Sequence, residues 1–219
     1  MANLFQADDP FPAVGPGVSY AEEKAHSAEV DAWLGLRIIE AETKVQDPGD
    51  GAQRWLHVPP ETFLTPYTEL RRMIELCAPA ENELVVDLGA GYGRLGFVIE
   101  RHTRARFLGL ELVAERVAEG SLALARFGAK RAELREADLA APGFKLPPAA
   151  WYFVYDYGTR AAIEKTLGDL QILARHQRVR VVGRGRAVRD AIERRHPWLS
   201  GVVDPRHHGN FSLYSSSDA

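Results

Sequence analysis

The stretch Val85-Val86-Asp87-Leu88-Gly89-Ala90-Gly91-Tyr92-Gly93-Arg94-Leu95-Gly96 decides the fold of this chain. Its first residues form an apolar run typical of a buried strand, and the glycines that follow open a helical pattern. Glycine lets the backbone turn sharply and approach a ligand closely, and the free N–H groups at the start of the helix point to the same place. In an open parallel sheet that place is the crevice beyond the carboxyl ends of the strands. The stretch therefore predicts a site for a nucleotide-like ligand.

Short β-branched or aromatic runs alternate with helical patterns along the rest of the chain. We expect strands at 84–86, 106–111, 131–135, 151–156, 178–183, 200–204 and 210–215, and helices at 67–77 and 93–100. Such alternation predicts an α/β fold, with a parallel sheet covered on both faces and doubly wound. The last two runs have no helix between them. They predict a final antiparallel hairpin with His207-His208-Gly209 in its loop.

The N-terminal part follows a different pattern. Residues 8–18 are too rich in Pro and Gly for a regular element and predict an extended arm. Ser19 followed by Glu22 is typical of a capping box, and apolar residues at helical spacing predict one helix over 19–45. The loop 47–51 ends this helix.

Composition excludes several classes of protein. With 219 residues, 46% hydrophobic and 26% charged, the chain is globular in composition. It has no apolar run of the ~20 residues needed to cross a membrane and no signal-peptide pattern, so we expect a cytoplasmic protein. The single cysteine, Cys77, excludes an intrachain disulfide and a thiolate zinc site. His207 and His208 have no ligand-spaced partners, and we expect no metal.

Charge is unevenly distributed along the chain. Residues 1–50 carry ten Asp or Glu against three Lys or Arg, whereas residues 171–219 carry nine Arg against four Asp or Glu. A basic face of this kind is a solvated surface, or it attracts nucleic acid or an acidic partner. No aromatic residue interleaves with these arginines before Trp198, so a stacking platform for single strands is not indicated.

Carboxylates at the strand ends suggest which ligand binds. Gly91-x-Gly93-x-x-Gly96 also satisfies the dinucleotide fingerprint, so an NAD-linked oxidoreductase is one interpretation. Asp87, directly before the glycines, would repel a pyrophosphate but attract the ammonium group of S-adenosylmethionine, unless it only caps the turn. Glu111 ends the second strand, where it can accept both ribose hydroxyl protons, and Asp138 follows the third, where it can accept from an adenine amino group.

These residues resemble a class I S-adenosylmethionine-dependent methyltransferase over about residues 57 to 156. The loop Asp87-Leu88-Gly89-x-Gly91-x-Gly93, Glu111 and Asp138 match the cofactor motifs of that family in order and spacing. The resemblance implies a Rossmann-like doubly wound seven-stranded sheet, mostly parallel with the last strand antiparallel. We divide the chain accordingly into an N-terminal arm and helix, residues 1–56, and a class I methyltransferase domain, residues 57–219.

Within the family, the sequence is most similar to seven-strand protein-lysine methyltransferases. They share the Asp-Leu-Gly-x-Gly-x-Gly-Arg motif, here ending in Arg94, the motif Gly109-Leu110-Glu111-Leu112, and a Ser on the next helix, here Ser121. Histone-lysine enzymes without a SET fold and enzymes that trimethylate the ATP synthase c-subunit are of this type. The resemblance implies S-adenosyl-L-methionine as cofactor, bound by Thr65, Asp87, Gly89, Ala90, Gly91, Arg94, Glu111, Leu112, Asp138, Leu139 and Tyr155.

The acceptor side is expected where the fourth strand ends, at Tyr155-Asp156-Tyr157. No proline follows Asp156, unlike the Asn/Asp-Pro-Pro-aromatic motif of nucleic-acid amino-methyltransferases, which disfavours a base amine. In lysine-modifying relatives, a segment similar to 57–67 covers the methionine end of the cofactor. We therefore take Asp156, Tyr157 and Tyr67 as candidate catalytic residues. The alternative is that the tyrosines complete the core and that the segment is a surface connector.

The sequence thus predicts an enzyme that transfers a methyl group to an amine, with a protein lysine ahead of a small molecule and nucleic acid disfavoured. Carbon-5 methylation of a pyrimidine needs a thiol, and Cys77 lies in an apolar helical stretch upstream. The alternatives are a small-molecule methyltransferase, an NAD-linked oxidoreductase, and a non-catalytic binding module that uses the basic C-terminal face.

Overall fold

The computed structural model describes residues 4–15, 17–47, 49–52, 55–56 and 58–217. The strands are β1 (Leu84–Leu88), β2 (Arg106–Glu111), β3 (Ala132–Glu136), β4 (Trp151–Val154), β5 (Arg180–Arg184), β6 (Arg206–His208) and β7 (Phe211–Ser215). The helices are α1 (Tyr20–Leu34), α2 (Ile38–Glu42), α3 (Tyr67–Cys77), α4 (Arg94–His102), α5 (Ala114–Phe127), α6 (Arg160–Leu173), α7 (Arg186–Arg195) and α8 (Pro197–Ser200), with a short 3-10 helix η1 (Pro60–Thr62).

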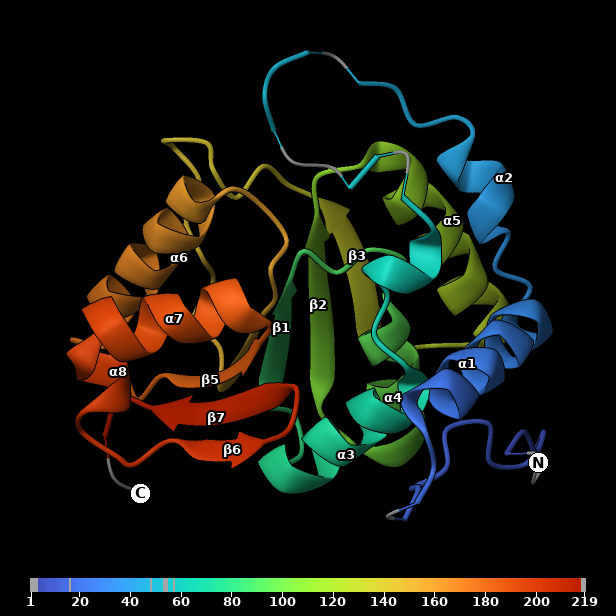
Figure 1. The fold of residues 1–219 in the computed structure, drawn as a ribbon, viewed down its shortest axis with the longest axis horizontal. Helices are drawn as coiled ribbons and strands as arrows, with labels where there is room; N and C mark the ends of the chain where they lie inside the picture. The colour runs from blue at the N-terminus through green and yellow to red at the C-terminus, as the bar shows by residue number, and fades with distance from the viewer. Residues whose placement is uncertain (1–3, 16, 48, 53–54, 57, 218–219) are drawn as a thin grey trace.

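The strands form one sheet in the order β3-β2-β1-β4-β5-β7-β6 (Figure 1). The first five strands of this order pair in parallel, and β7 is antiparallel to both β5 and β6. The expected doubly wound seven-stranded sheet with an antiparallel last strand is therefore confirmed. The chain reverses its direction of travel across the sheet between β1 and β4, and at such a switch point the crevice beyond the strand ends is where ligands bind.

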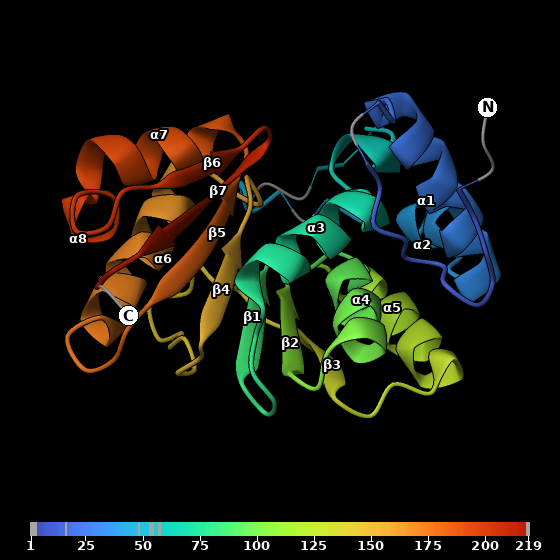
Figure 2. The ribbon, with the colours of Figure 1, turned by 90° about the horizontal axis from the view of Figure 1, so that it is seen from below.

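Alternating side chains build a core on each face of the sheet. Val85 and Phe107 belong to the core that includes residues of α3, α4 and α5, whereas their neighbours Val86 and Leu108 belong to the core under α6 and α7. Successive strand residues point to opposite faces, and a strand buried on both faces is apolar at nearly every position. Figure 2 shows the two layers of helices on either side of the sheet.

The N-terminal helix expected over 19–45 is wrong as a single element. The capping box is present, because the Glu22 N–H donates to Ser19 Oγ at 3.3 Å and the Ser19 N–H donates to Glu22 Oε2 at 2.9 Å. However, α1 ends at Gly35, which has a left-handed φ of 70°, and a separate α2 follows. Glycine adopts this conformation without strain, and apolar periodicity does not register the break.

The arm and α1 share the core of the main body. Phe11 is fully buried and its ring lies 5.1 Å from the ring of Tyr67, centroid to centroid. Val30 of α1 is also fully buried in the same core. Of the loop 47–51, Pro48 is outside the described residues, as is His57, which opens the segment 57–67. Asp47 and Asp50 there each accept a backbone N–H from two residues on.

The final hairpin exists, but its first strand is not where the sequence indicates. The expected strand 200–204 is wrong: α8 extends to Ser200, and Val202 is exposed. β6 instead contains His207 and His208, so these histidines lie in a strand and not in the loop. Residues 201–203 form bends, and the ladder begins at Arg206, directly after Pro205, which lacks an N–H donor and cannot itself donate to a ladder.

No helix in the described part of the chain is long and apolar enough to cross a membrane.

Candidate active site

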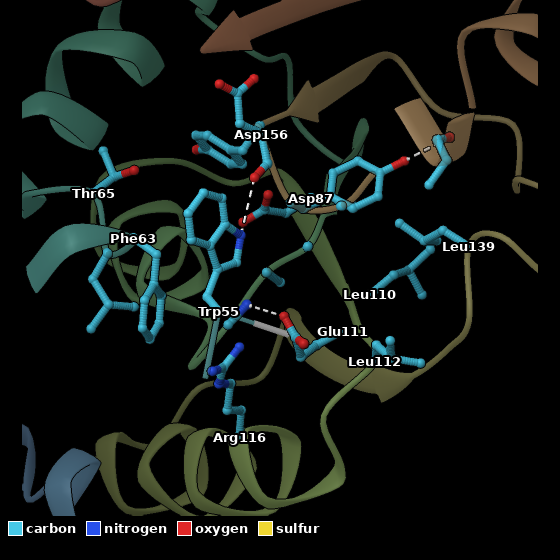
Figure 3. Close-up of a pocket in the computed structure, with 18 of the residues that line it drawn as sticks. Trp55, Phe63, Thr65, Asp87, Leu110, Glu111, Leu112, Arg116, Leu139 and Asp156 are labelled. Carbon is cyan, nitrogen blue, oxygen red and sulfur yellow. Dashed lines mark hydrogen bonds between the residues drawn. The ribbon is translucent and has the colours of Figure 1, made fainter. Parts of the chain in front are cut away.

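A cavity of about 280 Å³ lies at the carboxyl ends of β1, β2 and β4 (Figure 3). The glycine loop, Trp55 and the segment 62–65 all line this cavity. The expected site residues that line it are Thr65, Asp87, Gly89, Ala90, Gly91, Arg94, Glu111, Leu112, Asp138, Leu139, Tyr155, Asp156 and Tyr157. Tyr67 does not line it. The fold thus brings together residues spread over almost a hundred positions.

The glycine at position 89 is required by two features of the loop. Its φ is +83°, and a Cβ placed on it would lie 2.2 Å from the Cβ of Tyr157. No side chain fits in this space, and L-residues rarely adopt this φ. The loop can therefore pass close beneath a ligand.

Glu111 is tied to this loop as well as to its own strand end. Its Oε2 accepts the Gly91 N–H at 2.8 Å, and its Oε1 accepts the Val113 N–H at 3.0 Å. The side chain is buried. Because each carboxylate oxygen has two acceptor sites, Glu111 keeps one on each oxygen for ligand hydroxyls.

Asp87 is a carboxylate in the cavity lining whose burial disfavours its charged form. It is only 3% exposed, and its Oδ1 has no hydrogen-bond partner within the described residues. Burial, followed by the nearby Glu111 carboxylate, raises the pKa of Asp87 well above its usual range. An unpaired buried carboxylate is costly, so a cationic ligand group at this position would relieve the cost.

The end of the cavity away from Asp87 is apolar, with one polar edge. Leu110, Leu112 and Leu139 lie along one side of it in Figure 3. Asp138 is exposed at the rim, and its Oδ1 accepts the Ala140 N–H at 2.8 Å. Its Oδ2 is available to a donor, so this end suits a flat ring that carries an amino group.

Arg94 contacts the cavity but is held from behind. Its guanidinium forms a buried ion pair with Asp31 of α1, and its Nη1 donates to the Thr65 carbonyl at 3.0 Å. Tyr67 is fully buried beside it, and the Tyr67 hydroxyl donates to Asp31 Oδ1 at 2.8 Å. Tyr67 contacts Asp31 and Arg94, and of these two Arg94 lines the cavity. Nothing in the sequence indicates Asp31, which reaches this place through tertiary packing alone.

The expected acceptor-side residues are largely engaged in structural contacts. Asp156 Oδ1 accepts the Val188 N–H at 2.9 Å and Oδ2 accepts the Ala187 N–H at 3.3 Å, which caps α7. The Tyr157 hydroxyl bonds with the hydroxyl of Thr166, and burial raises the pKa of Tyr157 to about 12. Both residues line the cavity, but their polar atoms are already paired.

Tyr155 differs from these neighbours. Its hydroxyl is buried without a hydrogen-bond partner in the described structure. Burial, followed by the Asp87 charge, raises the pKa of Tyr155 well above its usual range, so the phenol stays protonated. It is a neutral polar group free to bond with a ligand.

Trp55, Phe63 and Arg116 are among the lining residues that the sequence-based prediction lacks. The Trp55 indole N–H donates to the backbone oxygen of Asp156 at 3.1 Å, and Trp55 lies in the middle of the cavity in Figure 3. The Phe63 ring lies 4.6 Å from the guanidinium of Arg116, which is paired with Glu42 of α2. The aromatic residues at 55 and 63 were the available sequence signal for this part of the cavity. No periodicity or motif marks them as lining a site.

Among the described residues, no group of three or more His, Cys, Asp or Glu could hold a metal ion. Cys77 is buried outside the cavity lining, and burial raises its pKa.

Comparisons with known proteins identify the fold. No protein-family model matches the chain, and no curated protein matches it in sequence. An RNA methyltransferase from Salinibacter ruber, in complex with S-adenosyl-L-homocysteine, is similar with a TM-score of 0.52 and 22% identity, over 69% of this chain and 91% of that protein. The putative methyltransferase yhhF from Escherichia coli gives 0.53 and 20%, over 74% and 92%.

TrmN from Thermus thermophilus gives a TM-score of 0.53 and 14% identity, over 69% of this chain and 48% of TrmN. The chain therefore spans about half the length of TrmN. At these identities the likeness concerns the fold.

Proposed function

We propose that this chain, whose fold is that of S-adenosylmethionine-dependent methyltransferases, binds S-adenosylmethionine and transfers its methyl group to an amine. The observation that carries the proposal is the buried Asp87 carboxylate at the end of β1, whose Oδ1 has no hydrogen-bond partner among the described residues. The cofactor supplies an α-ammonium group, which suits this carboxylate, and a sulfonium methyl, which is the transferable group.

The residues of the cavity fit the other parts of this ligand. Glu111 has an acceptor site left on each oxygen for the ribose hydroxyls. Leu112 and Leu139 provide the apolar sides of an adenine slot, and Asp138 offers an oxygen to the amino group at its rim. An NAD-linked oxidoreductase would also use Glu111, but its pyrophosphate would face the Asp87 charge.

Methyl transfer from a sulfonium needs mainly alignment of donor and acceptor and exclusion of water, and little acid–base chemistry. Asp156 is held in place by capping α7, with one hydrogen bond on each carboxylate oxygen, and Tyr155 remains protonated. The Tyr155 oxygen can accept an N–H of a neutral amine and so direct its lone pair toward the methyl group. The motif resemblance favours a protein lysine, and a cavity of about 280 Å³ also suits a small amine.

Adenine recognition gives a direct test of the cofactor assignment. We expect S-inosylhomocysteine, which has a carbonyl in place of the amino group, to bind the wild type about 10-fold more weakly than S-adenosylhomocysteine, because one hydrogen bond of ~1.4 kcal/mol is lost. Asp138→Ala should bind both analogues with equal affinity. Calorimetry measures all four pairs. Preference for the adenosyl form that persists in Asp138→Ala, or binding of NADH and not of the adenosyl compound, would contradict the assignment.

The class of acceptor is tested by transfer. We expect tritium from labelled cofactor to enter a host-cell lysate fraction and to remain after nuclease treatment, because no proline follows Asp156. Protease-sensitive label identifies a protein, and label that passes an ultrafilter identifies a small molecule. Label lost only to nuclease would overturn the amine proposal in favour of a nucleic-acid base, the class named for the Salinibacter ruber structure. Asp87→Asn, incubated in parallel, gives the background.

A further inference from the structure

A second, more open pocket of about 590 Å³ adjoins the cofactor cavity. It is lined by Tyr20, Arg184, Gly185, Arg186, Arg189, Gly209 and Asn210. These residues come from the start of α1, the end of β5, the start of α7 and the turn between β6 and β7. Arg184 and Gly185 line both pockets, so the two meet at the carboxyl end of β5.

Three arginines line this pocket together with the polar side chains of Tyr20 and Asn210, and no acidic residue is among the described residues that line it. Arg184 is fixed by the buried Glu69, whose Oε2 lies 2.9 Å from Arg184 Nη2, and by the Tyr20 hydroxyl at 3.0 Å. Arg184 is thereby held at the junction with little loss of side-chain freedom on binding.

The other two arginines belong to the first turn of α7. Arg189 pairs with Glu193 at 3.1 Å, whereas Arg186 is exposed and has no ion-pair partner in the described part of the chain. Glu69 and Glu193 pair with Arg184 and Arg189, and the Asp156 carboxylate accepts the Ala187 and Val188 N–H groups on the cofactor-cavity side of Gly185. Arg186 is therefore the arginine of the pocket whose guanidinium is left for a ligand. Guanidinium groups present forked N–H donors that match the geometry of carboxylate and phosphate oxygens.

We propose that this pocket is an oxyanion subsite for the methyl acceptor, and that the acceptor is a small molecule bearing both an amine and a phosphate or carboxylate. The inference rests on the proposed function, because it assigns the acceptor of that same reaction. The amine would lie near Tyr155 in the cofactor cavity, while the oxyanion is held across the shared edge at Arg184 by the arginines of α7.

Calorimetry with pyrophosphate, and separately with succinate, tests the subsite in protein saturated with S-adenosylhomocysteine. We expect one of the two anions to bind, and to bind at least about 10-fold more weakly to Arg186→Gln/Arg189→Gln, since charge-assisted hydrogen bonds are lost. Pyrophosphate as the tighter probe identifies a phosphate, and succinate identifies a carboxylate. Arg194→Gln is the matched control, because Arg194 lies on the same helix with its side chain 72% exposed and outside the pocket.

Separate outcomes distinguish this inference from the proposed function. Failure of wild type to bind S-adenosylhomocysteine rejects the proposed function. Normal binding of that compound by wild type and double variant, with no anion binding or equal anion binding by both, rejects the subsite alone. Displacement of S-adenosylhomocysteine by pyrophosphate also rejects it, because the anion would then occupy the cofactor cavity. An RNA hexamer that binds more tightly than pyrophosphate, loses affinity in the double variant and weakens steeply with salt would replace the small acceptor by nucleic acid.

Discussion

Asp87→Asn is expected to weaken S-adenosylhomocysteine binding by roughly 150-fold while making the ligand-free protein more stable. The loss corresponds to ~3 kcal/mol, within the range for truncating one partner of a buried charge pair. The gain in stability arises because a carboxylate buried at 3% exposure, with Oδ1 unpaired, is replaced by a neutral group of the same shape. The residue is thus unfavourable for folding and favourable for binding.

The pH dependence of both quantities follows from the raised pKa of Asp87. The folded state binds the proton more tightly than the unfolded state, so wild-type stability falls as pH rises from the ordinary Asp pKa toward the raised value. The stability advantage of Asp87→Asn should therefore widen over that window. Wild-type affinity for S-adenosylhomocysteine should increase over the same window, because the ligand requires the charged carboxylate.

Thermal unfolding and calorimetry across a pH series measure these effects. Asp204→Asn, which removes an exposed carboxylate between α8 and β6, should change neither. An Asp87→Asn protein that is less stable than wild type at every pH, or that binds S-adenosylhomocysteine equally well, would contradict this account of the site.

Asp31→Asn is expected to lower the free energy of unfolding by about 3–5 kcal/mol, because it leaves the buried Arg94 guanidinium without its counter-charge. Arg94→Met alone should also destabilise, since it strands the Asp31 carboxylate. The double variant Asp31→Asn/Arg94→Met removes both charges and should lose less than the sum of the two single effects.

Urea unfolding of wild type, the two single variants and the double variant measures the coupling free energy between Asp31 and Arg94. The Asp190–Arg194 pair is the control, because its side chains are 45% and 72% exposed and Asp190→Asn should cost no more than ~0.5 kcal/mol. Additive effects of Asp31→Asn and Arg94→Met would mean that the two residues do not stabilise each other. We also expect Asp31→Asn to weaken cofactor binding, because Arg94 orients the Thr65 carbonyl at the cavity.

The structure brings the residues expected to bind the cofactor to one cavity because the sequence signals for them are local. Asp87 and Glu111 lie at the carboxyl ends of β1 and β2, and the glycines and Asp138 follow β1 and β3 within a few residues. Parallel strands bring these carboxyl ends to one edge. A side chain's place in the chain then determines its place in the site.

The contacts of the candidate catalytic residues could not be predicted from the sequence because these contacts are long-range. Asp156 appears available in the sequence but caps α7, and Tyr67 appears close to the ligand but is buried against Asp31. Trp55 enters the cavity from a segment without periodicity. The helix break at Gly35 and the displaced β6 likewise depend on one backbone conformation and on one proline.

The contribution of the N-terminal residues to the core has a practical consequence. Phe11 and Val30 fill the interior that α3 and α4 share, and Asp31 neutralises Arg94. A truncation that begins at residue 57 would expose this apolar surface to water and leave an uncompensated cation beneath the glycine loop. Residues 56 and 57 therefore mark a change of sequence pattern. Shorter versions of the protein should not begin there.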